Sequence, residues 1–283
     1  MPGDAVFVRM NFQYGKNLKK NKSEYEKNAI LELYKKDKIV DKTAFYSLNK
    51  PSKKSLPYDF LAGLPLSSWL TEGEYTLKVI FYLDEKAKEF NLPVYFENKV
   101  FNSETIELNA ANTAIKTDNS PQRAQQIDKL NTILATPINT DIFSLKPCVS
   151  PTTSTRYTSY FGDRRVYAYS NGKSSTSLHY GNDYGIPTGT PVTSCAEGKV
   201  VMAEERISTG WSIVIEHLPG LYSLYYHLDS MNVKEGDMVK SGEVIGKSGC
   251  TGLATGPHLH WEVRLNMCAV RPEFFMSNFT FSE

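Results

Sequence analysis

Short apolar runs bounded by glycine turns constrain the fold of the second half of the chain most strongly. Residues 198–201, 211–216 and 221–227 are largely apolar, aromatic or β-branched, and glycines recur within residues 236–246. Short runs of this kind, separated by tight turns, are typical of β-strands. No long helical periodicity is present after residue 140. The sequence therefore predicts that this half is all-β.

Strand patterns also occur in the first half of the chain. From Tyr75 to Leu83, every second residue is apolar or aromatic, and a period of two places these side chains on one face of a strand. Residues 29–34 and 40–48 are expected to form a hairpin. Such a set of short strands predicts a small β-sandwich in residues 1–115.

One helical pattern separates the two strand-rich halves. Asp118 or Ser120 can cap a helix, and Pro121 suits its first turn. Apolar residues then recur at helical spacing. We therefore expect residues 116–145 to be a helical linker and residues 146–283 to be a second domain, which makes the fold class mainly β.

Composition and charge exclude several classes of protein. The chain has 283 residues, with 32 Lys and Arg against 31 Asp and Glu, and its formal net charge of +1 argues against a nucleic-acid-binding protein. Residues 16–54 hold 12 Lys against 5 Asp and Glu. The simplest interpretation is a solvated face, and attraction to an anionic polymer is the alternative. No run of about 18 apolar residues exists, so no transmembrane segment is predicted.

Histidine and cysteine are confined to the second half. All five histidines and all four cysteines follow residue 147, so polar chemistry is expected in the second domain. The cysteines form no C-x-x-C pair, so the sequence does not support a thioredoxin-like site or a zinc knuckle. The simplest expectation is that the four cysteines are small buried thiols. A lone histidine, His217, adjoins Leu218-Pro219-Gly220 and is expected at a turn or on the surface.

Three segments carry residue types that bind metal ions. His179 and Asp183 flank Gly181, which permits a sharp local bend, and His258 and His260 lie two apart in a strand-like run, so that both rings point to one side. A later strand-like run adds a further histidine at position 227. Imidazole and carboxylate groups bind zinc, and a catalytic zinc usually keeps three protein ligands and a water molecule. Spacing alone does not decide which of the four histidines bind a metal.

Taken together, these segments resemble the lysostaphin/LytM-type zinc endopeptidases, which cleave peptide bridges in bacterial peptidoglycan. That family shows H-x(3)-D, a later Tyr-x-His-Leu-like strand and Gly-Pro-His-Leu-His. The corresponding segments here are His179…Asp183, Tyr225-Tyr226-His227-Leu228 and Gly256-Pro257-His258-Leu259-His260. The resemblance covers about residues 156–275 and implies an all-β catalytic domain with an open groove in residues 146–283.

The resemblance also implies roles for individual residues. His179, Asp183 and His260 would bind one Zn²⁺ per chain, and His227 and His258 would be catalytic histidines that are not ligands. The implied activity is hydrolysis of peptide cross-links or stem peptides of peptidoglycan by zinc-activated water. The division of acid and base roles between the two catalytic histidines, the scissile bond, and the choice between endopeptidase and carboxypeptidase stay open.

A peptidoglycan substrate implies an exported protein, in the periplasm, in the cell envelope or outside the cell. Residues 1–4 lack the basic and apolar regions of an export signal, so we expect that a signal once preceded them. Residues 60–66 and 73–77 resemble an immunoglobulin-like domain that precedes some members of the family. Our hypothesis is that this amino-terminal domain partly blocks the groove until it is displaced.

The alternative is a catalytically silent relative that binds the cell wall or activates another wall hydrolase. Such relatives typically lose metal ligands, whereas every expected position is filled here. One departure from the family pattern is Cys250, where a small polar residue is expected. It is interpreted as a packed thiol, with aberrant metal binding or pairing with Cys268 as alternatives.

Overall fold

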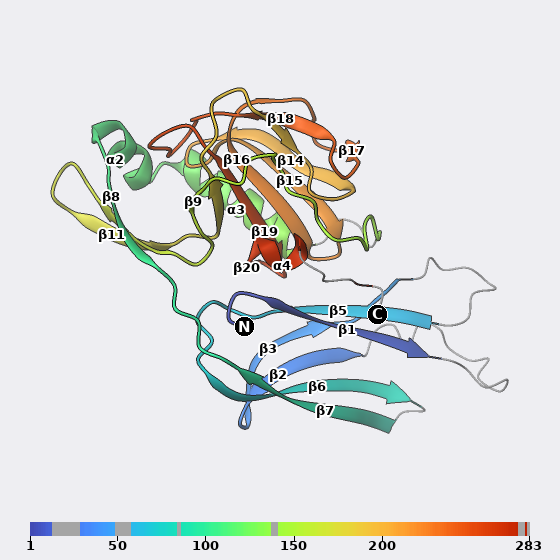
Figure 1. The fold of residues 1–283 in the computed structure, drawn as a ribbon. Helices are drawn as coiled ribbons and strands as arrows, with labels where there is room; N and C mark the ends of the chain where they lie inside the picture. The colour runs from blue at the N-terminus through green and yellow to red at the C-terminus, as the bar shows by residue number, and fades with distance from the viewer. Residues whose placement is uncertain (13–28, 49–57, 84–85, 137–140, 277–280, 282–283) are drawn as a thin grey trace. The chain divides into compact units, whose positions relative to one another are not determined.

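Extended segments account for most of the chain, as the sequence patterns predict (Figure 1). The computed structural model describes residues 1–12, 29–48, 58–83, 86–136, 141–276 and 281. It divides into one compact unit of Met1–Lys99 with Phe281–Glu283, and a second of Val100–Thr280. Much of the lysine-rich segment 16–54, and residues 137–140 of the predicted linker, lie outside the described residues.

The first unit is built from two antiparallel sheets. Its strands are β1 (Ala5–Phe12), β2 (Ile30–Lys35), β3 (Lys38–Ala44), β4 (Tyr46–Ser47), β5 (Tyr58–Pro65), β6 (Gly73–Leu83) and β7 (Lys86–Phe96). One sheet has the order β1-β5-β4 and the other the order β3-β2-β6-β7. Apolar side chains from both sheets meet in a single core, which is the predicted β-sandwich.

Alternation along the strands explains this core. Tyr75 and Leu77 on β6 are only 3% and 4% exposed, and Leu31 and Leu33 on β2 are fully buried. Complete burial of a leucine contributes roughly 1.5–3 kcal/mol. The predicted hairpin is also confirmed, because β2 and β3 pair around a turn in which Lys36 takes a φ of 54°. The immunoglobulin-like character of the sandwich stays a prediction.

The second unit contains all remaining elements. Its helices are α2 (Ala110–Thr117), α3 (Pro121–Ala135) and α4 (Pro272–Met276). Its strands are β8 (Ser103–Glu107), β9 (Tyr157–Ser159), β10 (Arg164–Ala168), β11 (Ser174–Leu178), β12 (Gly181–Tyr184), β13 (Pro191–Thr193), β14 (Gly198–Arg206), β15 (Gly210–Leu218), β16 (Leu221–Met231), β17 (Met238–Val239), β18 (Val244–Ser248), β19 (Leu259–Leu265) and β20 (Cys268–Val270).

A large sheet and a small sheet organise these strands. The large one follows the path β17-β14-β15-β16-β19-β12-β9, with β13 paired to β18, β18 also to β16, and β20 to β19. The small one has the order β11-β10-β8. The mainly β fold class is therefore confirmed.

The predicted helix is confirmed as α3 and packs on the large sheet. Its cap is Ser120, whose hydroxyl accepts a hydrogen bond from the Arg123 amide at 3.2 Å. Ile133 and Leu134 are buried against apolar residues of β14, β15 and β16, and the Tyr222 hydroxyl donates to the Ile133 carbonyl at 3.0 Å. The helix therefore covers part of the sheet.

The division between the compact units lies before the predicted boundary at residues 115 and 116. β8 pairs in parallel with β10, so residues 103–107 belong to the second unit. The following helix α2 had not been predicted. Its cap is Asn109, whose side chain accepts from the Asn112 amide at 2.8 Å.

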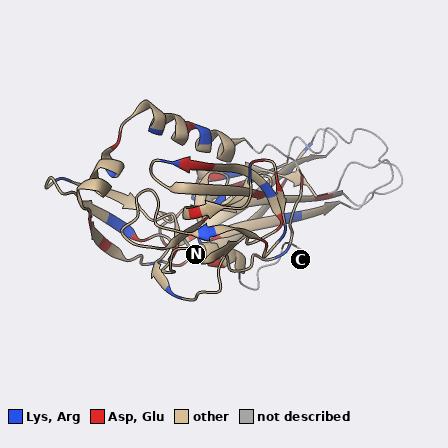
Figure 2. Ribbon diagram, turned by 90° about the horizontal axis from the view of Figure 1, so that it is seen from above, with Lys and Arg blue, Asp and Glu red and all other residues tan. Residues whose placement is uncertain are grey.

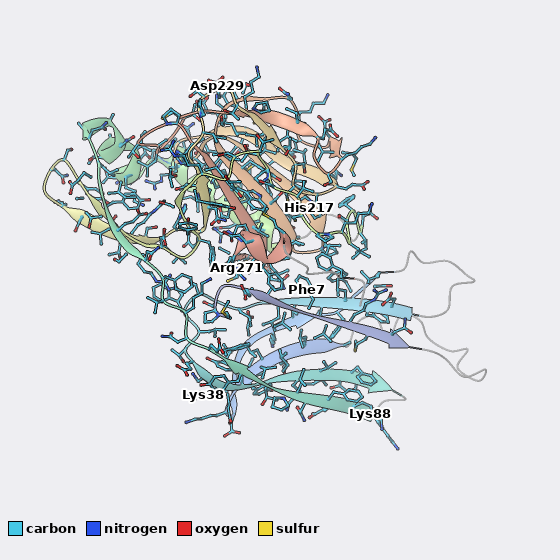
Figure 3. All side chains as sticks on the ribbon, in the orientation of Figure 1. Phe7, Lys38, Lys88, His217, Asp229 and Arg271 are labelled. Carbon is cyan, nitrogen blue, oxygen red and sulfur yellow. The ribbon has the colours of Figure 1, made fainter. Side chains whose placement is uncertain are left out.

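Charged side chains of both signs are interspersed over the strands and helices, in keeping with the near-zero net charge (Figure 2). Lys38 and Lys88 are exposed on the first unit (Figure 3). Among the described helices, none is both long enough and apolar enough for a membrane crossing.

Two expectations about single side chains are wrong. His217 is only 3% exposed and lies among the strands of the second unit (Figure 3). Its Nδ1 donates to the Glu197 carbonyl at 2.8 Å, and its Nε2 lies 2.7 Å from the Ser223 hydroxyl. Strand β15 continues through His217 before the turn begins, which explains its burial. All four cysteines are free, but Cys250 is exposed rather than packed, whereas Cys195 is fully buried.

Candidate metal centre

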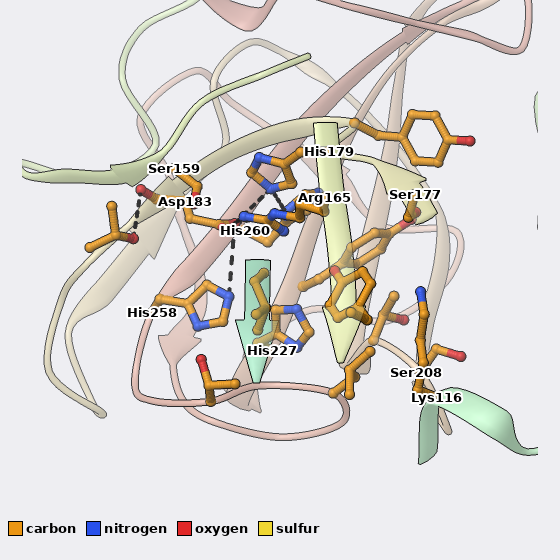
Figure 4. Close-up of a pocket in the computed structure, with 18 of the residues that line it drawn as sticks. Lys116, Ser159, Arg165, Ser177, His179, Asp183, Ser208, His227, His258 and His260 are labelled. Atoms are coloured by element: carbon orange, nitrogen blue, oxygen red, sulfur yellow. Dashed lines mark hydrogen bonds and ion pairs between the residues drawn. The ribbon is translucent and has the colours of Figure 1, made fainter. Parts of the chain in front are cut away.

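Three segments of the second unit bring His179, Asp183 and His260 together in one pocket (Figure 4). His179 directly follows β11, Asp183 lies on β12 and His260 lies on β19. Antiparallel pairing of β12 with β19 sets Asp183 directly opposite His260. The sheet register therefore fixes two of the three side chains against each other.

The donor atoms of these three residues form a small triangle. His179 Nε2 lies 3.1 Å and His260 Nδ1 lies 2.9 Å from Asp183 Oδ1. The two imidazole nitrogens are 3.0 Å apart. Tetrahedral zinc with bonds of about 2.0–2.1 Å separates its ligand atoms by roughly 3.3 Å. The triangle is thus close to the size that a zinc ion requires.

A hydrogen bond to His179 and a carboxylate near His260, each on the far side of the ring, indicate which nitrogen of each imidazole could face a metal ion. His179 Nδ1 donates to the Tyr160 carbonyl at 2.8 Å, so in the neutral ring Nε2 carries no proton and has a free lone pair. His260 Nε2 lies 3.7 Å from Glu262 Oε2, which favours a proton on that nitrogen and a lone pair on Nδ1. In the metal-free protein a proton of His260 lies between Nδ1 and Asp183 Oδ1. Once that proton is removed, two nitrogen lone pairs and a carboxylate oxygen would converge on one point. The donor set therefore fits a bound metal ion.

The electrostatics of the buried carboxylate agree with this arrangement. Burial disfavours the charged form of Asp183, but the charges and hydrogen bonds of His179 and His260 outweigh it and hold the pKa of Asp183 well below its usual range. Arg165 adds an ion pair at 2.8 Å to Oδ2. Burial also opposes protonation of His260, yet hydrogen bonds to Asp183 and Glu262 raise its pKa to about 9. Because a metal would displace that proton, metal binding is coupled to pH.

His227 and His258 lie beside the triangle and face the same pocket (Figure 4). Their ring centres are 4.6 Å apart, and His258 Nε2 lies 3.8 Å from Asp183 Oδ1. His227 has a φ of 61°, which is unusual for a residue other than glycine. This conformation interrupts the alternation of β16, so that Tyr226 and His227 both line the pocket. Local strain of this kind is often found at functional sites.

Both of these histidines present a free ring nitrogen to the pocket. His227 Nδ1 donates to the Thr251 carbonyl and His258 Nδ1 donates to the Gly256 carbonyl, each at 2.8 Å. In each neutral ring, Nε2 is then able to accept a proton. Burial, and then the positive charges of His258 and His260, lower the pKa of His227 to about 3. His227 is therefore neutral at neutral pH.

The pocket has a volume of about 540 Å³. Its walls include residues of β8, α2 and β10 as well as the strands that carry the histidines. Lys116, Tyr167 and Arg165 contribute polar groups to these walls. A pocket lined on several sides by polar groups suits a peptide better than a small apolar ligand.

Sequence reasoning missed several residues that position the centre. Arg165 holds Asp183, Glu262 lies near His260, and the ring of Tyr226 stacks on His260 with a 5.4 Å centre distance and a 7° angle. Partners of this kind orient metal ligands. Glu262 could have been found from the two-residue spacing that continues from His260 on the same strand. Arg165 comes from a separate sheet, and local spacing carries no signal for it.

Comparison with known proteins adds a family match. The sequence profile of peptidase family M23 matches residues 177–272. The matched range contains all of the histidines and the aspartate described above, but neither β8 nor α2.

Curated relatives are similar over part of the chain. The DD-carboxypeptidase/endopeptidase Mpg of Neisseria meningitidis serogroup B is 40% identical over 124 residues, which is 44% of this chain and 28% of that protein. The peptidoglycan DD-endopeptidase ShyB of Vibrio cholerae serotype O1 is 45% identical over 85 residues, which is 30% of this chain and 20% of that protein. The chain thus matches less than a third of the length of either relative.

One solved structure is similar in fold over nearly the whole chain. It is a Pseudomonas aeruginosa protein assigned to peptidase M23, with a TM-score of 0.60 and 21% identity. The similarity covers 99% of this chain and 95% of that one. At this identity the comparison shows the fold alone.

Proposed function

We propose that the chain is a zinc-dependent endopeptidase that hydrolyses peptide cross-links or stem peptides of bacterial peptidoglycan. The match of residues 177–272 to the profile of peptidase family M23 supports this proposal. The observation that carries the proposal is the triangle of donor atoms within about 3 Å of one another, with two further histidines beside it. The printed activities of the two curated relatives support the choice of substrate.

In this proposal His179, Asp183 and His260 hold one Zn²⁺ per chain. Two imidazole nitrogens and a carboxylate leave a fourth position open, as in catalytic zinc sites. When bound, zinc lowers the pKa of a water molecule toward about 7 and polarises a carbonyl oxygen. Arg165 donates to Oδ2 of Asp183 at 2.8 Å, which would leave Oδ1 available to the metal.

His227 and His258 move the protons of the reaction. His227 is placed to accept the proton of the attacking water, because its bond to the Thr251 carbonyl fixes the ring and leaves Nε2 unprotonated. The imidazolium formed in this way stabilises the developing negative charge and gives the same proton to the leaving amine. His258, held by the Gly256 carbonyl with its Nε2 unprotonated, is the alternative carrier of that proton. Loss of either group is expected to lower the rate roughly 100- to 10,000-fold.

The cellular setting follows from the substrate. Peptidoglycan lies outside the cytoplasm, so an exported chain is part of the proposal. Regulation of the peptidase by the amino-terminal unit also stays part of it. Equal rates of hydrolysis by the full chain and by a chain that begins at residue 100 would remove that regulatory role.

Digestion of purified peptidoglycans tests the proposed function. Sacculi with direct cross-links and sacculi with glycine bridges are incubated with the full chain, and product masses identify the scissile bond. The matched control is His179→Ala, which removes one ligand. The proposal expects new products from the wild type alone. Identical product profiles for both proteins would contradict it, and bound zinc without hydrolysis of any sacculus would favour the catalytically silent alternative.

A further inference from the structure

A row of side chains leads away from the candidate metal centre along one wall of the pocket. Arg165 contacts Asp183 at 2.8 Å, and Tyr167 lies two residues further along β10, on the same face of the strand. The ammonium of Lys116 lies 4.0 Å from the centre of the Tyr167 ring. Figure 4 shows the Lys116 amine directed into the pocket that the histidines share.

Lys116 carries a positive charge without an anionic partner. The carboxylates that line the pocket are already held by arginines: Glu104 and the aspartate of the metal centre by Arg165, and Glu262 by Arg264. Within the described part of the chain, no carboxylate forms an ion pair with Lys116 and no side chain accepts a hydrogen bond from its amine. Its one contact of note is the face of the Tyr167 ring.

The surroundings of Lys116 favour an incoming anion. Burial, and then the positive charges of Arg123 and Arg165, lower the pKa of the Lys116 ammonium below its ordinary value. A negative group bound there would offset this repulsion and stabilise the charged amine. A half-buried cation at a pocket wall is also less screened by solvent than a surface lysine.

The helix that carries Lys116 is fixed to the rest of the second unit. The buried Asn112 donates to the Ala254 carbonyl at 3.1 Å, in the loop that leads to the catalytic histidine at position 258. The buried Thr113 accepts from the Ser170 amide at 3.1 Å, just beyond β10. Both bonds hold α2 against the pocket, so Lys116 is positioned before any substrate arrives.

We propose that Lys116 binds a free carboxylate of the peptide substrate, and that the pocket thereby selects stem peptides that carry this anion. The inference rests on the proposed function and names the feature of the substrate that the same pocket recognises. Ile106 is the Cα partner of Tyr167 in the pairing of β8 with β10 and also lines the pocket. Its apolar side chain suits the methyl group of an alanine residue.

Two carboxylates of a stem peptide have the required chemistry, and the experiment separates them. One is the carboxyl terminus, and the other is the side-chain carboxylate of a diaminopimelate residue. The substrates are one cross-linked stem peptide with both groups free and two versions in which one or the other is amidated. Rates with the full zinc-loaded chain give kcat and KM, and calorimetry gives the Kd of an uncrosslinked stem tetrapeptide in free and amidated forms.

Three variants accompany the wild type. Lys116→Met removes the charge and keeps the length, Lys116→Arg keeps the charge, and Lys173→Met removes an exposed lysine at the turn between β10 and β11. The proposal expects Lys116→Met to raise KM and Kd for the free peptide roughly 10- to 100-fold, as loss of a hydrogen bond to a charged group does. It also expects this variant to have the same KM and Kd for the free and the amidated peptides. Lys116→Arg should keep the preference, and Lys173→Met should match the wild type.

The outcomes separate this proposal from the proposed function. If folded Lys116→Met cleaves peptidoglycan peptides and discriminates between free and amidated forms as the wild type does, Lys116 is not the carboxylate site, although the peptidase function stands. If the wild type cleaves none of the peptides, the proposed function fails. Calorimetry with the stem tetrapeptide then decides whether Lys116 binds the carboxylate. Weaker binding of the free peptide alone by Lys116→Met then retains the carboxylate site, and unchanged binding overturns it.

Discussion

A single methyl group at Gly181 should disturb the metal centre from within the sheet. A Cβ at this position would lie 2.2 Å from the Trp261 carbonyl oxygen on β19, whereas Cβ contacts below 3.0 Å are essentially never seen. The oxygen is a backbone atom and the backbone alone sets the position of the Cβ, so no side-chain rotation relieves the clash. The difference between 3.0 and 2.2 Å means that β12 and β19 must separate locally by at least about 0.8 Å. Asp183 and His260 form the Cα pair two residues along this register.

This displacement is large compared with the precision of a metal site. Ligands need to hold their positions within about 0.5 Å, and misplacement of about 1 Å costs on the order of 100-fold in rate. We therefore expect Gly181→Ala to weaken zinc binding roughly 10- to 100-fold and to lower hydrolysis about 100-fold. Overpacking should also lower the free energy of unfolding by about 1–3 kcal/mol.

Competition with a chromophoric zinc chelator gives the affinity, and release of soluble peptides from sacculi gives the rate. The matched control is Gly63→Ala on β5 of the first unit, where a Cβ would lie 2.4 Å from the Phe7 ring. This control adds a clash in the other unit, so zinc affinity should be unchanged. If folded Gly181→Ala binds zinc as tightly as the wild type and cleaves at the same rate, the reasoning from sheet register is refuted.

Three further predictions concern metal, pH and the buried core. Chelation should abolish hydrolysis, and one equivalent of zinc should restore it in the wild type but not in Asp183→Ala, as sacculus digestion will show. In the metal-free protein the pKa of His227 is about 3, below the value of about 6.5 in the unfolded chain. The unfolded state therefore binds the extra proton, and stability falls as the pH drops from about 6.5 toward 3, by about 2 kcal/mol at pH 5 through this group. Urea unfolding should show a shallower loss in His227→Gln, and equal slopes would contradict the assignment. His217→Leu should cost about 2–3 kcal/mol, because the Glu197 carbonyl and the Ser223 hydroxyl lose a buried partner, and urea unfolding should show this with zinc affinity unchanged.

Local patterns predicted the parts of the fold that local physics determines. Alternation of apolar and polar residues predicted the strand that contains Tyr75. The capping residue and the proline predicted the helix that begins at Pro121. The three segments with His179, Asp183 and His260 were identified as one candidate site, and the structure brings their donor atoms together. Their roles as ligands stay a proposal.

Sequence patterns did not predict the features that depend on pairing between strands far apart in the chain. β8 pairs with β10 some sixty positions later, and nothing in its five residues indicates that partner. This pairing brings Glu104 and Ile106 to the pocket, and the helix that follows brings Lys116. Gly181 was interpreted as a bend, but it begins strand β12, where its lack of a side chain permits close contact with β19. The burial of His217 was not predicted, because a turn sequence follows it directly.

X-ray absorption at the zinc edge of the zinc-loaded full chain tests the central claim most directly. The account predicts one zinc per chain with two imidazole nitrogens and one carboxylate oxygen from the protein, and a changed ligand shell in Asp183→Ala. Sulfur ligation, or a spectrum that is the same in the wild type, His179→Ala and Asp183→Ala, would contradict it.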